Sequence, residues 1–360
     1  KGALMHADAE LNKKTMDAEL DAEPSCLADL NDDLLRKIAS RLAESDLASA
    51  VALKRCSSRF KDLATPLVAN AVSRINTKWR DAADKIGEEG AARIRGGLER
   101  NGVLTTLNLL GNNIRAEGAA AIAEALRGNG VLTNLDIEIN DIGPGGAEAI
   151  AEALQGNEVL KSLNLWDNSI GDEGAKALAS ALRVNEVLTS LEVGFNSLTE
   201  ESALGIVRVE RQRNKLTSLG LGGCSIGPTG AAGIAEYVSG SGVLKSLDLD
   251  DNHVGAEGAA AIAEALRGNG VLKTLDLNGN KIGDEGAKAI GGALADNAGL
   301  TNLVLYDNRI GNEGAKALAA ALRVNEVLKN IDLSPNNLGD EGRKAIHDAV
   351  SGREGFELVI

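Results

Sequence analysis

Aromatic residues are scarce in this sequence, and their scarcity limits the kind of core that the chain can build. Only seven of its 360 residues are Phe, Trp or Tyr, although hydrophobic residues make up 44% of the chain. The interior must therefore consist of Leu, Ile, Val and Ala side chains. Such a composition favours a thin architecture built from a repeated unit over a thick globular core.

Cysteines and long apolar runs are also few. Cys26, Cys56 and Cys224 show no paired spacing, which predicts a reducing compartment and no disulfide framework. No apolar run approaches the roughly 20 residues that a membrane-spanning helix needs, so we expect no membrane insertion. We expect a cytoplasmic or nuclear protein. Because the chain begins at Lys1 without an initiator Met, the sequence leaves organelle targeting open.

Positive charge is the minority charge, with 38 Lys and Arg against 52 Asp and Glu and a net charge of −14. Nucleic-acid backbones require clustered Lys and Arg, so nucleic acid is not an expected partner. The sequence also contains no G-x-S-x-G nucleophile turn, no phosphate-binding loop and no histidine pair at metal-ligand spacing. These absences predict a protein without cofactor or enzymatic activity. They favour protein partners with a basic or mixed surface.

A repeat of 28 residues dominates the chain. Residues 116–132 recur letter for letter as residues 256–272. The units begin, without insertion or deletion, at Leu104, Leu132, Leu160, Leu188, Leu216, Leu244, Leu272, Leu300 and Leu328. A fixed period in this range predicts a solenoid, in which each unit buries its apolar face against the next.

Each unit joins a strand pattern to a helix pattern. Leu107 and Leu109 alternate, which places both on one face of a short strand. Ile122 and Leu126 then follow at helical spacing within an alanine-rich segment. A glycine such as Gly118 recurs near the start of this segment and predicts either close backbone packing or a special turn.

An asparagine column accompanies the strands. The ninth position of the unit is Asn, as in Asn112 and Asn140, in every unit except the one that carries Cys224. An Asn side chain both donates and accepts hydrogen bonds, so such a column can satisfy the turn backbone of neighbouring units. The pattern L-x-x-L-x-L-x-x-N-x-I/L-G over residues 104–355 resembles the leucine-rich repeat of the ribonuclease-inhibitor type.

This resemblance implies an α/β solenoid of horseshoe shape, with a parallel sheet on the concave face and helices on the convex face. It also implies that outward strand positions bind proteins, although a fold alone does not define a function. We expect a degenerate capping unit at 76–103, nine repeats at 104–355 and a truncated tenth strand at 356–360. Residues 1–26 are expected to form a flexible acidic tail.

Residues 27–75 lie outside the repeat and are expected to form a small helical segment. They resemble an F-box, with Asn31 standing where that motif has proline; the matching positions are Leu30, Asp33, Leu34, Leu35, Ile38, Leu42, Asp46, Leu47, Cys56 and Phe60. The resemblance implies that Leu30, Leu34, Leu35, Ile38, Leu42 and Leu47 bind a Skp-family adaptor of a cullin-type ubiquitin ligase. The alternative is a helical cap on the open end of the solenoid.

The outward positions of the strands and the following turns are rich in carboxylates. Positions three, five, seven and eight hold no Lys or Arg, but they hold Asp136, Glu138, Asp167, Glu192, Asp248, Asp250, Asp251, Asp276, Asp307 and Asp332. The same positions carry the aromatic residues Trp166, Phe195 and Tyr306. One interpretation is a binding face for a basic protein segment with aromatic anchors. The other is a solvated sheet face whose acids maintain solubility.

The middle of the array departs from the pattern. Gly220, Gly222 and Gly223 leave one unit without side chains on its inner face, and Glu210 replaces a helix leucine. This departure indicates either a degenerate repeat or a local function. For the whole chain we expect a substrate receptor of a ubiquitin ligase. The alternatives are a stand-alone or immune-receptor-like scaffold, a structural subunit of a larger complex, and a Ran-type GTPase-activating protein.

Overall fold

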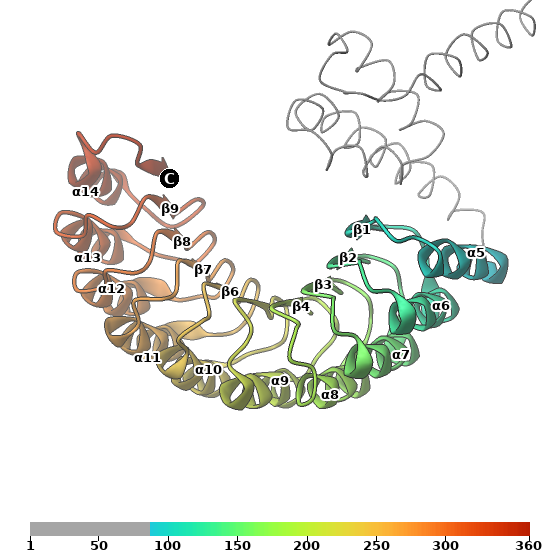
Figure 1. The fold of residues 1–360 in the computed structure, drawn as a ribbon. Helices are drawn as coiled ribbons and strands as arrows, with labels where there is room; N and C mark the ends of the chain where they lie inside the picture. Colours follow the sequence, from blue (N-terminus) through green and yellow to red (C-terminus); the bar gives the residue numbers. More distant parts are fainter. Residues whose placement is uncertain (1–86) are drawn as a thin grey trace, which may run out of the picture. The chain divides into compact units, whose positions relative to one another are not determined.

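The structure is a computed structural model that describes residues 87–360, all of them within one compact unit. Helices and strands alternate along this part of the chain (Figure 1). The helices are α5 (Gly87–Glu99), α6 (Arg115–Gly128), α7 (Gly143–Gly156), α8 (Gly171–Leu182), α9 (Glu200–Arg213), α10 (Pro228–Gly240), α11 (Gly255–Gly268), α12 (Gly283–Leu294), α13 (Asn312–Leu322) and α14 (Asp340–Val350). The strands are β1 (Thr106–Asn108), β2 (Asn134–Asp136), β3 (Ser162–Asn164), β4 (Ser190–Glu192), β5 (Ser218–Gly220), β6 (Ser246–Asp248), β7 (Thr274–Asp276), β8 (Asn302–Val304), β9 (Asn330–Asp332) and β10 (Glu357–Val359).

The strands form one parallel sheet in chain order, β1 to β10. Leu107 pairs with Leu135, one repeat later, and this register continues through β9. The expected tenth strand is present, with Leu358 opposite Ile331. In Figure 1 the strands line the inner side of the arc and the helices its outer side, which confirms the predicted α/β solenoid.

The core follows the predicted pattern. Leu107 and Leu109 point inward and are at most 2% exposed, and Ile122 of α6 is fully buried against them. The recurrent helix glycine serves close packing between neighbouring helices, because a Cβ on Gly174 would lie 2.9 Å from the Cβ of Ala147. A side chain there would force α7 and α8 apart.

The asparagine column forms the predicted ladder of hydrogen bonds. The Asn140 Nδ2 donates to Leu109 O at 2.8 Å and to Ile137 O at 2.9 Å, and its Oδ1 accepts from Asn112 N at 2.8 Å. Cys224 occupies the same buried column, but its Sγ lies 3.5 Å from Gly222 O and makes only that contact with the turn backbone. One asparagine per repeat thus satisfies backbone groups that the short strands leave unpaired.

A second asparagine column, which the sequence analysis did not recognise, lies just after the helices. The Asn157 Nδ2 donates to Leu126 O at 2.7 Å, and its Oδ1 accepts from Leu160 N at 2.8 Å. The equivalent buried residues are Asn129, Asn185, Asn269, Asn297 and Asn325. These side chains bond the end of the preceding helix and the start of the next strand, where backbone groups would otherwise remain unsatisfied.

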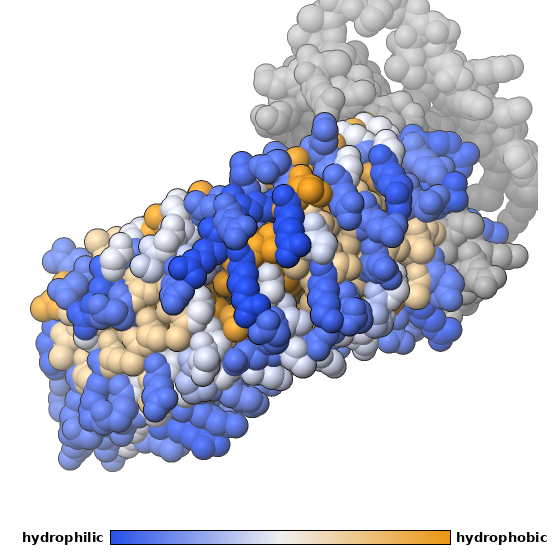
Figure 2. Space-filling model, turned by 90° about the horizontal axis from the view of Figure 1, so that it is seen from below, coloured by the Kyte–Doolittle hydropathy of each residue, from blue (hydrophilic) through white to orange (hydrophobic). Residues whose placement is uncertain are grey.

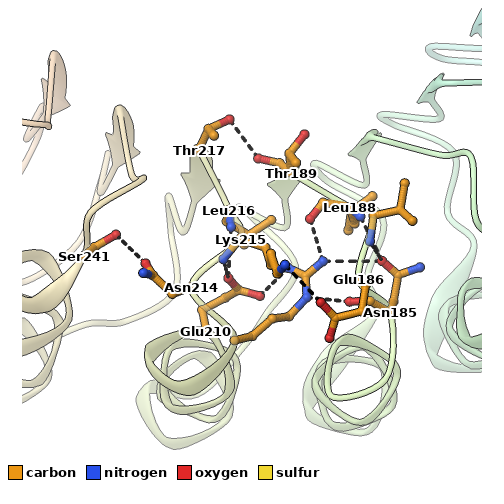
Figure 3. A network of polar contacts seen from close by, with 12 residues as sticks. Asn185, Glu186, Leu188, Thr189, Glu210, Asn214, Lys215, Leu216, Thr217 and Ser241 are labelled. Atoms are coloured by element: carbon orange, nitrogen blue, oxygen red, sulfur yellow. Dashed lines mark hydrogen bonds and ion pairs between the residues drawn. The ribbon is translucent and has the colours of Figure 1, made fainter.

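A buried ion pair replaces one asparagine of this second column in the middle of the array (Figure 3). The Arg213 Nη1 lies 2.6 Å from the Glu210 Oε1, and both side chains are at most 4% exposed. The guanidinium donates to Asn185 O and Leu188 O, each at 2.6 Å, while the Glu210 Oε2 accepts from Leu216 N at 3.1 Å. The pair therefore donates and accepts as the asparagine does elsewhere. The altered sequence of α9 therefore keeps the backbone hydrogen bonds that the second asparagine column makes in other repeats.

The helix side of the array carries charged side chains of both signs, which form ion pairs with one another. Figure 2 shows hydrophilic side chains over much of this side, with paler strips between them and small hydrophobic patches near the middle. In residues 87–360, every ion pair joins side chains of the helices or of the loops that follow them. None of the described helices is long and apolar enough to cross a membrane.

Candidate functional site

The concave face presents the fifth residue of each repeat, and where this residue is Asp, Asn or Glu its side chain accepts a hydrogen bond from the backbone of the following turn. The Asp248 Oδ1 accepts from Asp250 N at 2.8 Å, which closes the turn after β6. Asn164 closes the turn after β3 in the same way, with its Oδ1 3.0 Å from Trp166 N. A neutral oxygen is therefore sufficient for the turn. The negative charge at Asp248 is a property of the face that the fold does not require.

The eighth residue has a left-handed backbone in the first eight repeats, whereas the ninth repeat has Pro335 there. Asp167, Asp251 and Asp307 have φ values of 49°, 48° and 47°. Asp tolerates this conformation better than most residues, so the fold explains these three predicted acids without a partner. Ile139 and Phe195 have the same backbone conformation, each with φ 55°, but they are neither Asp nor Gly. A branched or bulky residue in this region is strained by roughly 1–2 kcal/mol.

Two of the three predicted aromatic anchors meet on the face, and we call them the aromatic pair. The ring centroids of Trp166 and Phe195 are 4.9 Å apart, with a 49° angle between the ring planes. The Phe195 ring also lies against the next repeat, because a Cβ on Gly223 would be 2.9 Å from its Cδ1. Tyr306 is 42% exposed and lies four repeats away from Phe195, so the predicted trio is not one site.

Three glycines, Gly220, Gly222 and Gly223, form what we call the glycine floor beneath two side chains of the preceding repeat. A Cβ on Gly220 would coincide with the carboxyl group of Glu192. A Cβ on Gly222 would lie 3.1 Å from the Phe195 Cε2. The missing side chains of the β5 repeat therefore make room for Glu192 and Phe195. This is a structural reason for the glycines that the sequence showed only as a departure.

Beside the glycine floor lies a group of four carboxylates, Glu192, Asp248, Asp250 and Asp276, which we call the acidic cluster. Burial, with the nearby carboxylates of Asp248 and Glu138, raises the pKa of Glu192 to about 7. Burial is also the main cause that raises the pKa of Asp250 and of Asp276 to about 6, and it raises the pKa of Asp248. Neighbouring carboxylates add to the effect of burial at Glu192, Asp250 and Asp276, so a bound cation would relieve both effects.

No cation compensates the acidic cluster within the described residues. None of its four carboxylates takes part in an ion pair. Basic residues stand at the borders of the face, immediately before the strands at Lys161, Lys245, Lys273 and Lys329 and in the following turns at Lys281 and Arg309. The centre of the face thus carries negative charge alone.

The other predicted residues fall outside this group. Asn108 donates to the Asp136 Oδ2 at 2.7 Å and Asn164 to the Glu138 Oε2 at 2.9 Å, while Asp332 accepts from Ser334 N at 2.9 Å. The six F-box-like leucine and isoleucine positions lie outside the described residues. No group of His, Cys, Asp and Glu in residues 87–360 has the geometry of a metal site.

Ile139, a large apolar side chain that is 44% exposed on this face, was not predicted from the sequence. Its backbone adjoins the aromatic pair, since Ile139 N donates to Trp166 O at 2.9 Å. The sequence does distinguish this residue. Most eighth positions of the repeat are Gly or Asp, and only a few, including Ile139 and Phe195, are apolar.

The fold and this exposed sheet face define a repeat-built module for protein interaction. The family model described as "Leucine Rich repeat" matches just over half of the chain, at residues 101–123, 128–151, 156–179, 213–235, 243–263, 268–291, 297–319 and 324–346. The chain belongs to the leucine-rich repeat proteins. The unmatched interval, residues 180–212, contains all of α9 except its last residue, including Glu210 of the buried ion pair.

Several solved structures resemble the chain at low similarity. A leucine-rich repeat-containing protein of Legionella pneumophila, LegL7, has 18% identity and a TM-score of 0.40, covering 69% of this chain and 91% of its own. Actin-binding site 2 of leiomodin-1 has 23% identity and a TM-score of 0.35, covering 41% and 85%. The Rad7 and Elc1 complex in yeast has 13% identity and a TM-score of 0.33, covering 87% and 97%. Among curated proteins, no match was found.

Proposed function

We propose that this protein is a non-enzymatic binding module whose concave face holds a protein segment with basic and apolar side chains. The observation that carries the proposal is the uncompensated acidic cluster. Lys and Arg neutralise carboxylates on the helix side but are absent from the centre of the sheet face. Complementary charge would steer a basic partner to this face and select it against acidic ones.

Apolar contacts support the same proposal. Phe195 of the aromatic pair lies on the glycine floor beside the acidic cluster, and Ile139 adjoins Trp166 on the other side of the pair. None of these three side chains belongs to the buried core. Aromatic side chains surrounded by polar groups commonly supply most of the binding energy of an interface. Ile139 and Phe195 have bulky side chains at a left-handed backbone position where Gly or Asp would be less strained, and the fold alone does not require these residue types.

Site-specific photo-crosslinking tests which face binds. A photoreactive phenylalanine derivative replaces Thr274 on the concave face or, as the control, Ala260 on helix α11. The probe is a biotinylated nonapeptide of Gly and Ser with three Lys and three Arg residues. We expect crosslinking from position 274 and little from position 260. Equal crosslinking from both positions would contradict the proposal.

A role as a substrate receptor of a cullin-type ubiquitin ligase is a second candidate, supported by the F-box-like residues of the 27–68 segment. In this function Leu34 and Leu35 bind the Skp-family adaptor, and the concave face binds the substrate. Co-purification of a Skp-family adaptor with the full chain, and its loss in Leu34→Asp/Leu35→Asp, would support the assignment. Adaptor binding that survives deletion of residues 27–68 would rule it out. The protein would then be a stand-alone scaffold or a subunit of another complex.

A further inference from the structure

We propose that the aromatic pair and the acidic cluster together form a subsite for one arginine side chain of the partner. This proposal rests on the proposed function of the concave face and specifies the partner's chemistry there. Two independent observations carry it. The first is the position of the Phe195 ring beside the carboxylates, and the second is that no Lys or Arg side chain of residues 87–360 forms an ion pair with them.

The rings and the carboxylates follow one another along a continuous row of hydrogen-bonded repeats. Phe195 N donates to Gly222 O, and Gly223 N donates to Asp250 O, both at 2.7 Å. One repeat, that of the glycine floor, therefore separates the backbones of Phe195 and Asp250. Parallel strands lie about 4.8 Å apart, which sets this separation at roughly 10 Å. The Phe195 ring leans over the glycine floor and shortens the gap further.

Carboxylates also approach the glycine floor from both sides. Glu192 lies over Gly220 from the preceding repeat, and its Oε1 accepts from Gly194 N at 2.9 Å, which fixes the side chain. Asp248 pairs with Gly220 in the sheet register from the following repeat. The two carboxylates therefore flank one residue that has no side chain. Both retain oxygen lone pairs for a donor that arrives from the solvent side.

An arginine fits this arrangement better than a lysine. The guanidinium is planar and has five N–H donors, so it can stack on the Phe195 ring while it donates to more than one carboxylate. An ammonium group is compact and more strongly hydrated, and it gains less from the ring. The residues of the subsite that contact the guanidinium are Phe195, Glu192 and Asp248. Trp166 holds the Phe195 ring in place through the tilted contact.

The fold requires positive φ at the position of Phe195 but does not require a bulky side chain there. Most equivalent residues are Gly or Asp, which adopt positive φ at lower cost. Its ring contacts Trp166 and the surface of the glycine floor and does not enter the leucine core. A phenylalanine is therefore retained at a position that favours small residues, where its ring is available to a ligand.

Binding of two matched peptides to the full chain tests the subsite. Both are fluorescent nonapeptides of Gly and Ser, one with three Arg residues and one with three Lys residues at the same positions. Fluorescence anisotropy at low salt should show the arginine peptide binding about fivefold more tightly. Phe195→Leu should reduce this preference to less than twofold and leave the lysine peptide nearly unaffected. Tyr306→Leu, the aromatic control on the same face, should keep the preference.

The possible outcomes separate this proposal from the proposed function. Equal binding of both peptides, lost together in Glu192→Gln/Asp248→Asn, would overturn the arginine subsite and support the basic-partner function. A preference that survives both Phe195→Leu and Trp166→Leu, with unchanged melting temperatures, would also overturn the subsite. Failure of both peptides to bind would overturn the proposed function itself.

Discussion

The carboxyl group of Glu192 occupies the space that a Cβ of Gly220 would fill, one strand away in the sheet. This relationship joins two features that are separate in the sequence, a carboxylate on β4 and a glycine on β5. The glycine lets the carboxylate lie flat on the sheet among other acids, where burial raises its pKa. The unusual glycines of the central repeat thus shape the charge of the concave face.

Gly220→Ala should lower the pKa of the Glu192 carboxyl group toward its ordinary value. The added methyl group would displace the carboxyl group toward solvent, so we expect its pKa to fall from about 7 toward the ordinary value for Glu, 4.5. A pH titration of the side-chain carboxyl carbon by NMR measures this change. Gly242→Ala, whose Cβ would meet nothing within 4 Å, is the matched control and should leave the pKa unchanged. An unaltered Glu192 in Gly220→Ala would refute the steric explanation.

Stability should fall as the pH rises through the titration range of the acidic cluster. The raised pKa values of Glu192, Asp250 and Asp276 mean that the folded chain holds more protons than the unfolded chain between about pH 4 and 7. Ionisation of these groups therefore favours unfolding, and the melting temperature should be higher at pH 5 than at pH 8.

Other carboxylates act in the opposite direction but in a lower range. Hydrogen bonds lower the pKa of Asp172, Glu201 and Glu341, so their contribution is lost only as the pH falls below about 4. Scanning calorimetry of the chain and of Glu192→Gln/Asp250→Asn/Asp276→Asn measures the effect. The triple variant should show a flatter profile between pH 5 and 8. A wild-type melting temperature that rises over this interval would contradict the interpretation.

The Glu210–Arg213 pair should behave as one replaceable unit. Glu210→Ala leaves a buried guanidinium without its partner, and a loss of about 3–5 kcal/mol in the free energy of unfolding is expected. The double variant Glu210→Leu/Arg213→Asn restores the residues of the other repeats, such as Leu182 and Asn185, and should be at least as stable as the natural chain. Urea unfolding of the natural chain and of both variants measures these free energies. A double variant less stable than Glu210→Ala would show that the pair has no equivalent in the asparagine column.

Ile139→Asn should stabilise the fold. The residue is 44% exposed and has φ 55°, a conformation that Asn adopts more readily than a branched side chain. We expect a gain of about 1 kcal/mol in the free energy of unfolding, measured by urea titration. Asp167→Asn has the same backbone conformation and is the control, with little change expected. A destabilised Ile139→Asn would mean that the side chain packs more favourably than its exposure indicates.

The repeat made most of the fold predictable. Leu107, Leu109 and Asn112 repeat with a fixed period, so one set of local rules described every strand and ladder position. The second asparagine column was equally periodic but was not interpreted, because its role appears only when the helix end and the next strand are adjacent. The ion pair of Glu210 and Arg213 could not be predicted from either residue alone. Its function depends on backbone groups of the preceding repeat and of the next strand.

The candidate site was predicted only in part. The sequence placed carboxylates and aromatic residues on one face, and the structure brings Trp166 and Phe195 together while Tyr306 stays apart. Asp167, Asp251 and Asp307 were predicted from charge, whereas positive φ already explains their residue type. The position of Glu192 over Gly220 depends on a side-chain conformation, and no periodic pattern carries that information.

Charge-matched variants test most directly whether the concave face binds basic partners. The concave variant is Glu192→Gln/Asp248→Asn/Asp276→Asn, and Asn keeps the turn hydrogen bond that Asp248 makes. At pH 8, where the carboxylates of the cluster are mostly ionised, the helix-side variant with the same change in net charge is Glu117→Gln/Glu148→Gln/Glu257→Gln, all exposed residues.

Fluorescence anisotropy at pH 8 and equal ionic strength, with a fluorescently labelled form of the Lys- and Arg-containing nonapeptide, gives the affinity of each variant. We predict that the concave variant weakens binding by about tenfold, because each lost contact contributes a few tenths of a kcal/mol or more, and that the helix-side variant stays within twofold of the natural chain. Equal weakening by both variants would show that only the net charge attracts the peptide, and would contradict a binding site on the concave face.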